Sequence, residues 1–102
     1  MLLSKAHLYS EEKQLASFYF GGYDYPTRLR IIRMLRDEGP HTVFDLWQGH
    51  PISLPAFSQH IEILRKKELV DFTPKYPYLI YHLDEENYER SKNCILSFFL
   101  KE

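Results

Sequence analysis

The sequence predicts a mainly α-helical domain with one small β-hairpin, an α+β arrangement. Three observations support this fold class: the chain has 102 residues, apolar residues recur at helical spacing along most of it, and that spacing is interrupted once. At residues 69–83, β-branched and aromatic runs lie on either side of Pro74-Lys75-Tyr76-Pro77, which predicts a hairpin. We therefore expect one domain over residues 1–102, with a single core.

The first two predicted helices are delimited by glycine and proline. The first spans about residues 5–20 and is expected to end at Gly21-Gly22. The second begins at Pro26, because the missing N–H of proline costs nothing in a first turn, and ends at Gly39-Pro40. Its expected buried stripe is Leu29, Ile32 and Leu35, with Ile31 and Met34 beside it. Its remaining surface is expected to carry Arg28, Arg30, Arg33 and Arg36.

Residues 42–67 predict two helices joined by a tight turn. Thr42 and Asp45 fit a capping box that starts a short helix through Trp47. Ser53 is a good N-cap for the next helix, which ends in Arg65-Lys66-Lys67, where cations favour the helix dipole. Its expected buried stripe is Phe57, Ile61 and Leu64.

The last predicted helix covers residues 84–102 and begins with three acidic residues that suit its N-terminal dipole. Its second half is apolar almost all round, and such a helix is not stable alone in water. Two helices joined by a tight turn and followed by a hairpin describe a winged helix-turn-helix, with the helix-turn-helix at 42–67 and the wing at 69–83.

Three segments in this order resemble the ArsR family of small bacterial transcription factors. Residues 26–35, PTRLRIIRML, are very similar to the family's second helix, PTRLRIL-LL. Residues 52–64, ISLPAFSQHIEIL, align with its recognition helix, LSQSTVSHHLKVL, and RKKELV at 65–70 is similar to REAGLV. Residues 78–83, YLIYHL, are similar to its wing strand, WVYYRL. The resemblance covers residues 24–90 and implies a sequence-specific DNA-binding transcriptional regulator, which we expect to be a repressor.

The resemblance also implies which residues contact double-stranded DNA. The outward residues at the start of the recognition helix would face the bases: Leu54, Pro55, Ala56, Ser58 and Gln59. Cations around that helix and on the wing would contact phosphates: Arg28, Arg65, Lys66, Lys67 and Lys75. The family has polar residues at the first three outward positions and a glycine-containing cationic wing tip, whereas this chain has neither. These departures favour an alternative, a winged-helix module that binds protein.

Dimerisation is expected through the helices at the two ends, 5–20 and 84–102, which the family pairs about a two-fold axis. The expected contacts are Leu8, Leu15, Phe18 and Tyr19 on the first helix, and Ile95, Phe98 and Phe99 on the last. A two-fold homodimer places two recognition helices one DNA turn apart, about 34 Å, so the expected site is an imperfect inverted repeat.

An effector is left open by the sequence. Tyr19, Tyr23 and Tyr25 with the last helix could hold a small aromatic or apolar ligand, but a simple buried aromatic cluster is favoured over such a site. A regulator without a ligand, which acts only through its concentration, is equally open.

Composition and motifs exclude several other classes of protein. A formal charge of −1 excludes a uniformly basic protein, and one cysteine, Cys94, excludes a disulfide scaffold. The third helix lacks the cysteine pair of metal sensors, and His82 with Asp84 would supply only half of the family's other metal site, so we expect no metal and no cofactor. No catalytic motif is present, and no apolar run is long enough for a membrane span or signal peptide. We expect a cytoplasmic protein that is not an enzyme and does not bind membranes.

Overall fold

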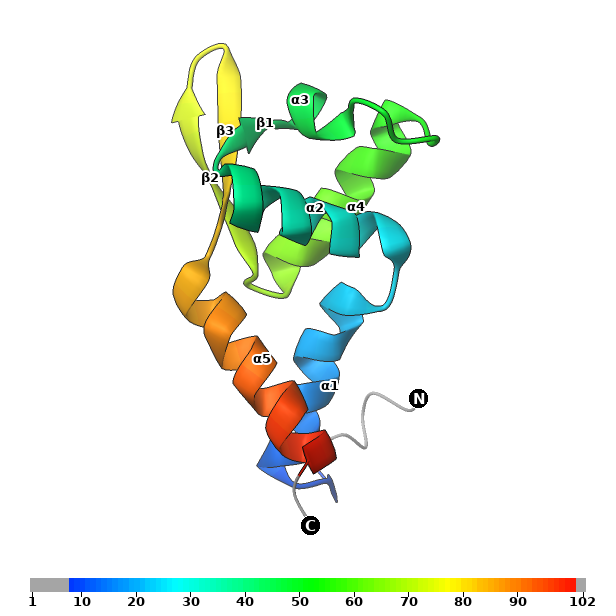
Figure 1. Cartoon of the computed structure of the whole chain (residues 1–102), viewed down its shortest axis with the longest axis vertical. Coiled ribbons are helices and arrows are strands. Elements are labelled where there is room, and N and C mark those ends of the chain that lie inside the picture. The colour runs from blue at the N-terminus through cyan, green and yellow to red at the C-terminus, as the bar shows by residue number, and fades with distance from the viewer. Residues whose placement is uncertain (1–7, 101–102) are drawn as a thin grey trace.

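The computed structural model describes residues 8–100 and confirms the mainly helical fold with a small antiparallel sheet. Its helices are α1 (Glu11–Tyr23), α2 (Pro26–Glu38), α3 (Val43–Trp47), α4 (Leu54–Lys66) and α5 (Glu85–Leu100). Its strands are β1 (His41–Thr42), β2 (Val70–Lys75) and β3 (Tyr78–Leu83). Figure 1 shows α1 and α5 packed together at one end of the molecule, while the β2–β3 wing reaches the other end. The terminal helices thus form an arm that projects from the winged-helix body.

Three predicted helix starts are confirmed by side-chain caps. The Thr42 hydroxyl accepts a hydrogen bond from the Asp45 backbone N–H at 3.1 Å, and the Ser53 hydroxyl accepts one from Ala56 at 3.3 Å. The Asp84 carboxylate accepts one from the Asn87 N–H at 3.0 Å. Each cap satisfies a first-turn N–H that has no partner within its own helix, and so fixes where the helix begins.

The predicted end of the first helix is wrong, because α1 continues through both glycines to Tyr23. Gly22 is buried, and a Cβ atom there would lie 2.7 Å from Cδ1 of Leu69. Gly22 therefore allows α1 to pack closely against the winged-helix body, and it does not end the helix. Leu8 precedes α1, and residues 5–7 of the predicted helix lie outside the described residues.

The wing belongs to a three-stranded antiparallel sheet in the order β1-β3-β2. Strand β1 was not predicted from the sequence, and its two residues pair with Tyr81 and Ile80 of β3. Strand β2 also extends further than expected, since Pro74 pairs with Leu79 and only Tyr76 and Pro77 are left to form the turn. Pro74 is tolerated because β2 lies at the edge of the sheet, where its missing N–H breaks no ladder.

The core lies between α2, α4 and the sheet. The predicted stripe of α4, Phe57, Ile61 and Leu64, is confirmed as fully buried. The stripe predicted for α2 needs correction: its buried residues are Arg28, Ile31, Ile32 and Leu35, which follow the i, i+3, i+4, i+7 pattern of one helix face. Leu29 lies one residue out of that register and is 50% exposed.

Candidate nucleic-acid interface

The turn between α3 and α4 holds the start of α4 in a defined position. The Trp47 indole N–H donates to the Ile52 carbonyl at 2.8 Å, which closes the loop between the two helices. Gly49 has a φ of +81°, a left-handed conformation that favours glycine. The His50 ring packs edge-on against Phe57, 4.7 Å between ring centroids, and so ties this loop to the core. The N-terminal turn of α4 is therefore presented on a fixed scaffold.

The five residues expected to face DNA bases differ in how accessible they are. Pro55, Ser58 and Gln59 are exposed, and all three lie in the first half of α4. Leu54 and Ala56 are half-buried, so they offer only part of their apolar surface. The amide of Gln59 can hydrogen-bond an adenine edge, and the Ser58 hydroxyl can bond a base or a phosphate.

The structure corrects the expectation for Arg28, which is 7% exposed. Its guanidinium forms an ion pair with Asp24, donates to the Gly22 carbonyl at 3.3 Å, and donates to Nδ1 of His60 at 2.9 Å. These bonds use the donors that a phosphate would need. Arg28 therefore fastens the end of α1 to α2 and α4 and is not available to DNA.

Lys67 is directed toward α1 rather than toward an open surface. Its ammonium lies 4.7 Å from the centroid of the Phe18 ring, which is the geometry of a cation–π contact. A Cβ atom at Gly21 would lie 3.1 Å from the same ammonium, so the lysine also covers that glycine. Lys67 therefore packs against α1 and is not directed toward DNA phosphates.

Three of the expected phosphate contacts remain accessible: Arg65, Lys66 and Lys75. Lys66 and Lys75 are exposed, on the last turn of α4 and at the end of β2. The Arg65 guanidinium stacks over Phe72 at 5.0 Å and lies 3.8 Å from Glu62, so it is partly positioned by the wing. These cations connect the recognition helix to the wing.

His60 lies on α4 but points back toward α2. Its ring stacks on Tyr25 with 4.6 Å between centroids, and its Nδ1 accepts the hydrogen bond from Arg28. Burial, and then the positive charge of Arg28, lowers the pKa of His60. A neutral imidazole at this position is the form that can accept from the guanidinium.

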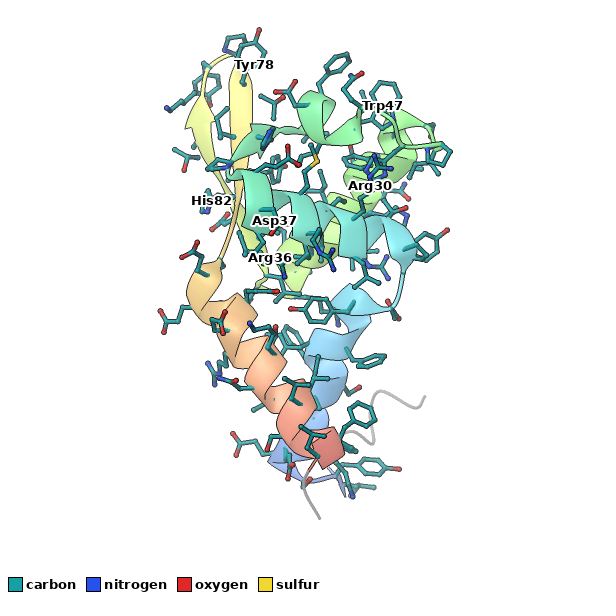
Figure 2. All side chains as sticks on the ribbon, in the orientation of Figure 1. Arg30, Arg36, Asp37, Trp47, Tyr78 and His82 are labelled. Carbon is teal, nitrogen blue, oxygen red and sulfur yellow. The ribbon has the colours of Figure 1, made fainter. Side chains whose placement is uncertain are left out.

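The wing tip carries two exposed tyrosines that the sequence analysis did not assign to the interface. Tyr76 is 91% exposed, Tyr78 is also exposed, and both lie beside Lys75. Figure 2 shows Tyr78 at the far end of the wing, at the opposite end of the molecule from the terminal helices. The signal in the sequence was the pair of tyrosines around Pro77, since side chains at the turn of a hairpin lie at the surface of a domain.

The residues expected at the dimer interface form a partly continuous apolar surface. Phe98 and Phe99 are exposed on α5, Ile95 is half-buried, and Leu8 is exposed ahead of α1. Leu15 and Phe18 are half-buried against the core. Tyr19 does not belong to this surface, because it is 2% exposed and packs inside the core. Three more apolar side chains are exposed on the same two helices and were not among the expected dimer contacts: Phe20, Leu96 and Leu100.

A groove of about 430 Å³ lies along the arm, between α1 and α5. Its apolar side chains are Phe20, Ile95, Phe98 and Phe99. Ala16 and Gly21 line the groove on the α1 side. The groove is lined mainly by apolar atoms and is open to solvent.

In residues 8–100 no group of three or more His, Cys, Asp or Glu side chains is placed to hold a metal ion. Among the same residues, every helix is too short or too polar to cross a bilayer.

Comparisons with known proteins agree with this geometry. The family described as bacterial regulatory protein, arsR family, matches residues 25–71. The transcriptional repressor SdpR of Bacillus subtilis (strain 168) is 32% identical over 76 residues, which are 74% of this chain and 83% of SdpR. A crystal structure described as a possible transcriptional regulator for arsenical resistance matches with a TM-score of 0.73 at 28% identity, over 79% of this chain and 83% of that chain. NolR from Sinorhizobium fredii shares the fold, with a TM-score of 0.69 at 24% identity over 87% of this chain and 88% of NolR.

Proposed function

The chain belongs to the arsR family of bacterial regulatory proteins, and we propose that it acts as a dimeric repressor. As a member of this family it is a DNA-binding transcriptional regulator and not an enzyme. The relative SdpR is named a transcriptional repressor, which supports repression as the mode of action. The observation that carries the proposal is the exposed pair Ser58 and Gln59, held on a helix whose start is fixed by the Trp47–Ile52 hydrogen bond. A regulator of this kind acts on DNA in the cytoplasm.

In the proposed complex the first half of α4 lies in the major groove. Gln59 contacts a base edge through its amide, Ser58 contacts a base or phosphate, and the partly exposed Ala56 touches a thymine methyl. Arg65, Lys66 and Lys75 bind phosphates on either side of the groove. The wing tip, with its tyrosines, follows the adjacent backbone.

We propose that a second copy of the chain covers the groove between α1 and α5. An open apolar groove on a small soluble protein is unfavourable in water, and Phe98 and Phe99 add exposed aromatic surface beside it. A two-fold axis through this arm sets the two copies of α4 apart by about one turn of DNA, which suits an imperfect inverted repeat.

The direct test of the proposed base contacts is a double variant, Ser58→Ala with Gln59→Ala. Its affinity for duplexes from the upstream region of its own gene and for scrambled duplexes would be measured by fluorescence anisotropy. Loss of one bidentate contact costs about 1–3 kcal/mol of discrimination, so we expect specific affinity to fall about tenfold or more while nonspecific affinity is unchanged.

Asn93→Ala on the exposed side of α5 is the matched control and is expected to bind as the unmodified chain does. Unchanged discrimination in the double variant would overturn the assignment of base contacts to α4. If no duplex is bound at low salt, while the protein still dimerises, the alternative of a winged-helix module that binds protein would take its place.

A further inference from the structure

A second hollow, separate from the arm groove, lies between α2, the end of α1 and the start of α5. It has a volume of about 420 Å³, which is within the range of small-molecule sites. Its walls are three arginines of α2, the tyrosines Tyr23 and Tyr88, and the apolar side chains of Leu29 and Ile32. It shares no lining residue with the arm groove and none with the DNA contacts proposed above.

Positive charge is concentrated at the rim of this pocket. Arg30, Arg33 and Arg36 lie on successive turns of α2, and all three are exposed. Only Arg36 has a carboxylate partner within 4.0 Å among residues 8–100, namely Asp37 at 2.8 Å. The Arg30 guanidinium lies beside the α3–α4 turn, since a Cβ atom at Gly49 would be 3.3 Å from one of its nitrogens, so Arg33 and Arg36 carry the charge nearest Tyr23 and Tyr88. Figure 2 shows Arg30 and Arg36 on opposite sides of α2, with Arg30 toward Trp47. In a chain with a formal charge of −1, this excess of cations favours an anion.

The floor of the pocket is apolar and aromatic. The Tyr23 hydroxyl is hydrogen-bonded to Ser91, which is fully buried. The Tyr88 hydroxyl accepts a hydrogen bond from Arg36 at 3.4 Å. Because both hydroxyls are engaged, the two tyrosines offer mainly their rings to the pocket, beside the half-exposed Leu29. A small inorganic ion would leave this apolar surface uncovered, whereas an aromatic body would cover it.

We propose that this pocket binds an aromatic carboxylate, with the carboxylate on Arg33 and the ring system against Tyr23, Leu29 and Tyr88. Guanidinium groups bind carboxylates through paired hydrogen bonds, and they also stack on flat rings. Arg36 is less available than Arg33, since it already holds Asp37 and Tyr88, and the Arg30 guanidinium lies against Gly49.

The position of the pocket makes the bound carboxylate a regulator of DNA binding. Helix α2 packs against the recognition helix α4, while α5 packs against α1 in the arm. The Arg36–Tyr88 hydrogen bond joins α2 to α5 across the pocket, and a ligand lying there would add contacts between the same two elements. A ligand that favours one angle between body and arm changes the distance between the two α4 helices of a dimer, and so couples to DNA affinity. This regulatory role rests on the proposed function, whereas binding of the carboxylate does not.

The test uses 2-naphthoate and phenylacetate as probes, titrated into the full chain by calorimetry, with 2-naphthamide and inorganic sulfate as comparison compounds. We expect at least one carboxylate to bind with a dissociation constant below about 1 mM, and the amide and sulfate to bind about tenfold more weakly or not at all. Arg33→Gln should weaken carboxylate binding about tenfold. Arg90→Gln, an exposed arginine of α5 outside the pocket, should leave it unchanged.

Absence of binding by both carboxylates up to about 10 mM would overturn the proposal. The proposal would also be overturned if the neutral amide or sulfate bound as tightly as the carboxylate, or if Arg33→Gln left carboxylate binding unchanged. The DNA affinity of the same samples separates the two halves: carboxylate binding without a change in that affinity would overturn the regulatory role alone. Carboxylate binding by a chain that binds no duplex would instead contradict the proposed function.

Discussion

Arg28 illustrates at the residue scale how burial assigns a different role to a side chain that the sequence alone places on the surface. It occupies the first position of the buried stripe of α2, and its guanidinium joins α1, α2 and α4 through Asp24, the Gly22 carbonyl and His60. The sequence signal for this role is an arginine at a position of the buried stripe, because a long charged side chain is buried only where hydrogen-bonding or charged partners are present.

Replacing Arg28 should therefore reduce stability and not phosphate binding. We expect Arg28→Ala to lower the free energy of unfolding by about 1–3 kcal/mol; the value stays modest because Asp24 is half exposed and its ion pair is screened. Urea unfolding measures this, with the exposed Arg33→Ala as control, expected to change stability by less than about 0.5 kcal/mol. A stable Arg28→Ala protein whose DNA affinity depends less on salt would contradict the structural role.

His60 predicts a pH dependence of stability. Burial and Arg28 lower its pKa in the folded chain, and burial and Arg30 lower that of His50 in the same direction. The unfolded chain thus binds protons at a pH where the folded chain does not, so stability falls as the pH drops through about 6.5 toward the lower folded pKa. We expect the urea midpoint to decrease from pH 7.5 to 5.5, and His60→Gln to reduce that decrease. An identical decrease in the variant would show that His60 does not contribute.

At the element scale, helix starts were predictable because each depends on a local signal. Thr42, Ser53 and Pro26 lie where the helices begin, and each acts through its own backbone neighbours. The two residues of β1 could not be predicted, since His41 and Thr42 become a strand only by pairing with Tyr81 and Ile80 about 40 residues away. The predicted end of α1 was wrong for a similar reason, because the role of Gly22 depends on its contact with Leu69, far along the chain.

The two adjacent glycines of α1 provide a matched test of that explanation. Gly22→Ala places a methyl group 2.7 Å from Leu69, so we expect a loss of about 1–3 kcal/mol in the free energy of unfolding. Gly21→Ala meets only the end of the Lys67 side chain, at 3.1 Å, which can move aside. There the better helix propensity of alanine should leave stability unchanged or raise it by up to about 1 kcal/mol. Similar effects of both substitutions on thermal unfolding would contradict the close packing of α1 on the body.

At the scale of the whole molecule, the order of elements was predictable and the arrangement of surfaces was not. Helical spacing with one hairpin indicates the winged helix-turn-helix, but Tyr19 and Phe20 are adjacent in sequence and only the packed arm shows which of them is buried. The same holds for the pocket under α2, which brings Tyr23 and Tyr88 together from opposite ends of the chain. The three tyrosines of the expected effector site do not meet, since Tyr19 is in the core and Tyr25 stacks on His60.

The exposed aromatic side chains of the arm predict that the chain forms a dimer. Phe99 is 69% exposed and contacts Phe20 beside the groove, so we expect Phe99→Glu to convert a dimer into a monomer, because burying a carboxylate in an apolar interface is costly. Light scattering coupled to size exclusion measures the mass. Phe44→Glu, at an aromatic that is 58% exposed on α3, is the control and should keep the mass of the dimer. A monomeric unmodified chain, or a dimeric Phe99→Glu chain, would refute the proposed interface.

The salt dependence of binding tests whether a dimer of this chain binds DNA through cations of α4 and the wing. Three accessible cations in each protomer, Arg65, Lys66 and Lys75, give about six phosphate contacts in a dimer, so the logarithm of the association constant should fall against the logarithm of the salt concentration with a slope of about −5. Lys66→Gln with Lys75→Gln should reduce the slope to about −2, since two of the three contacts are lost in each protomer. A slope near zero, or one that the double variant leaves unchanged, would show that these cations do not bind DNA phosphates.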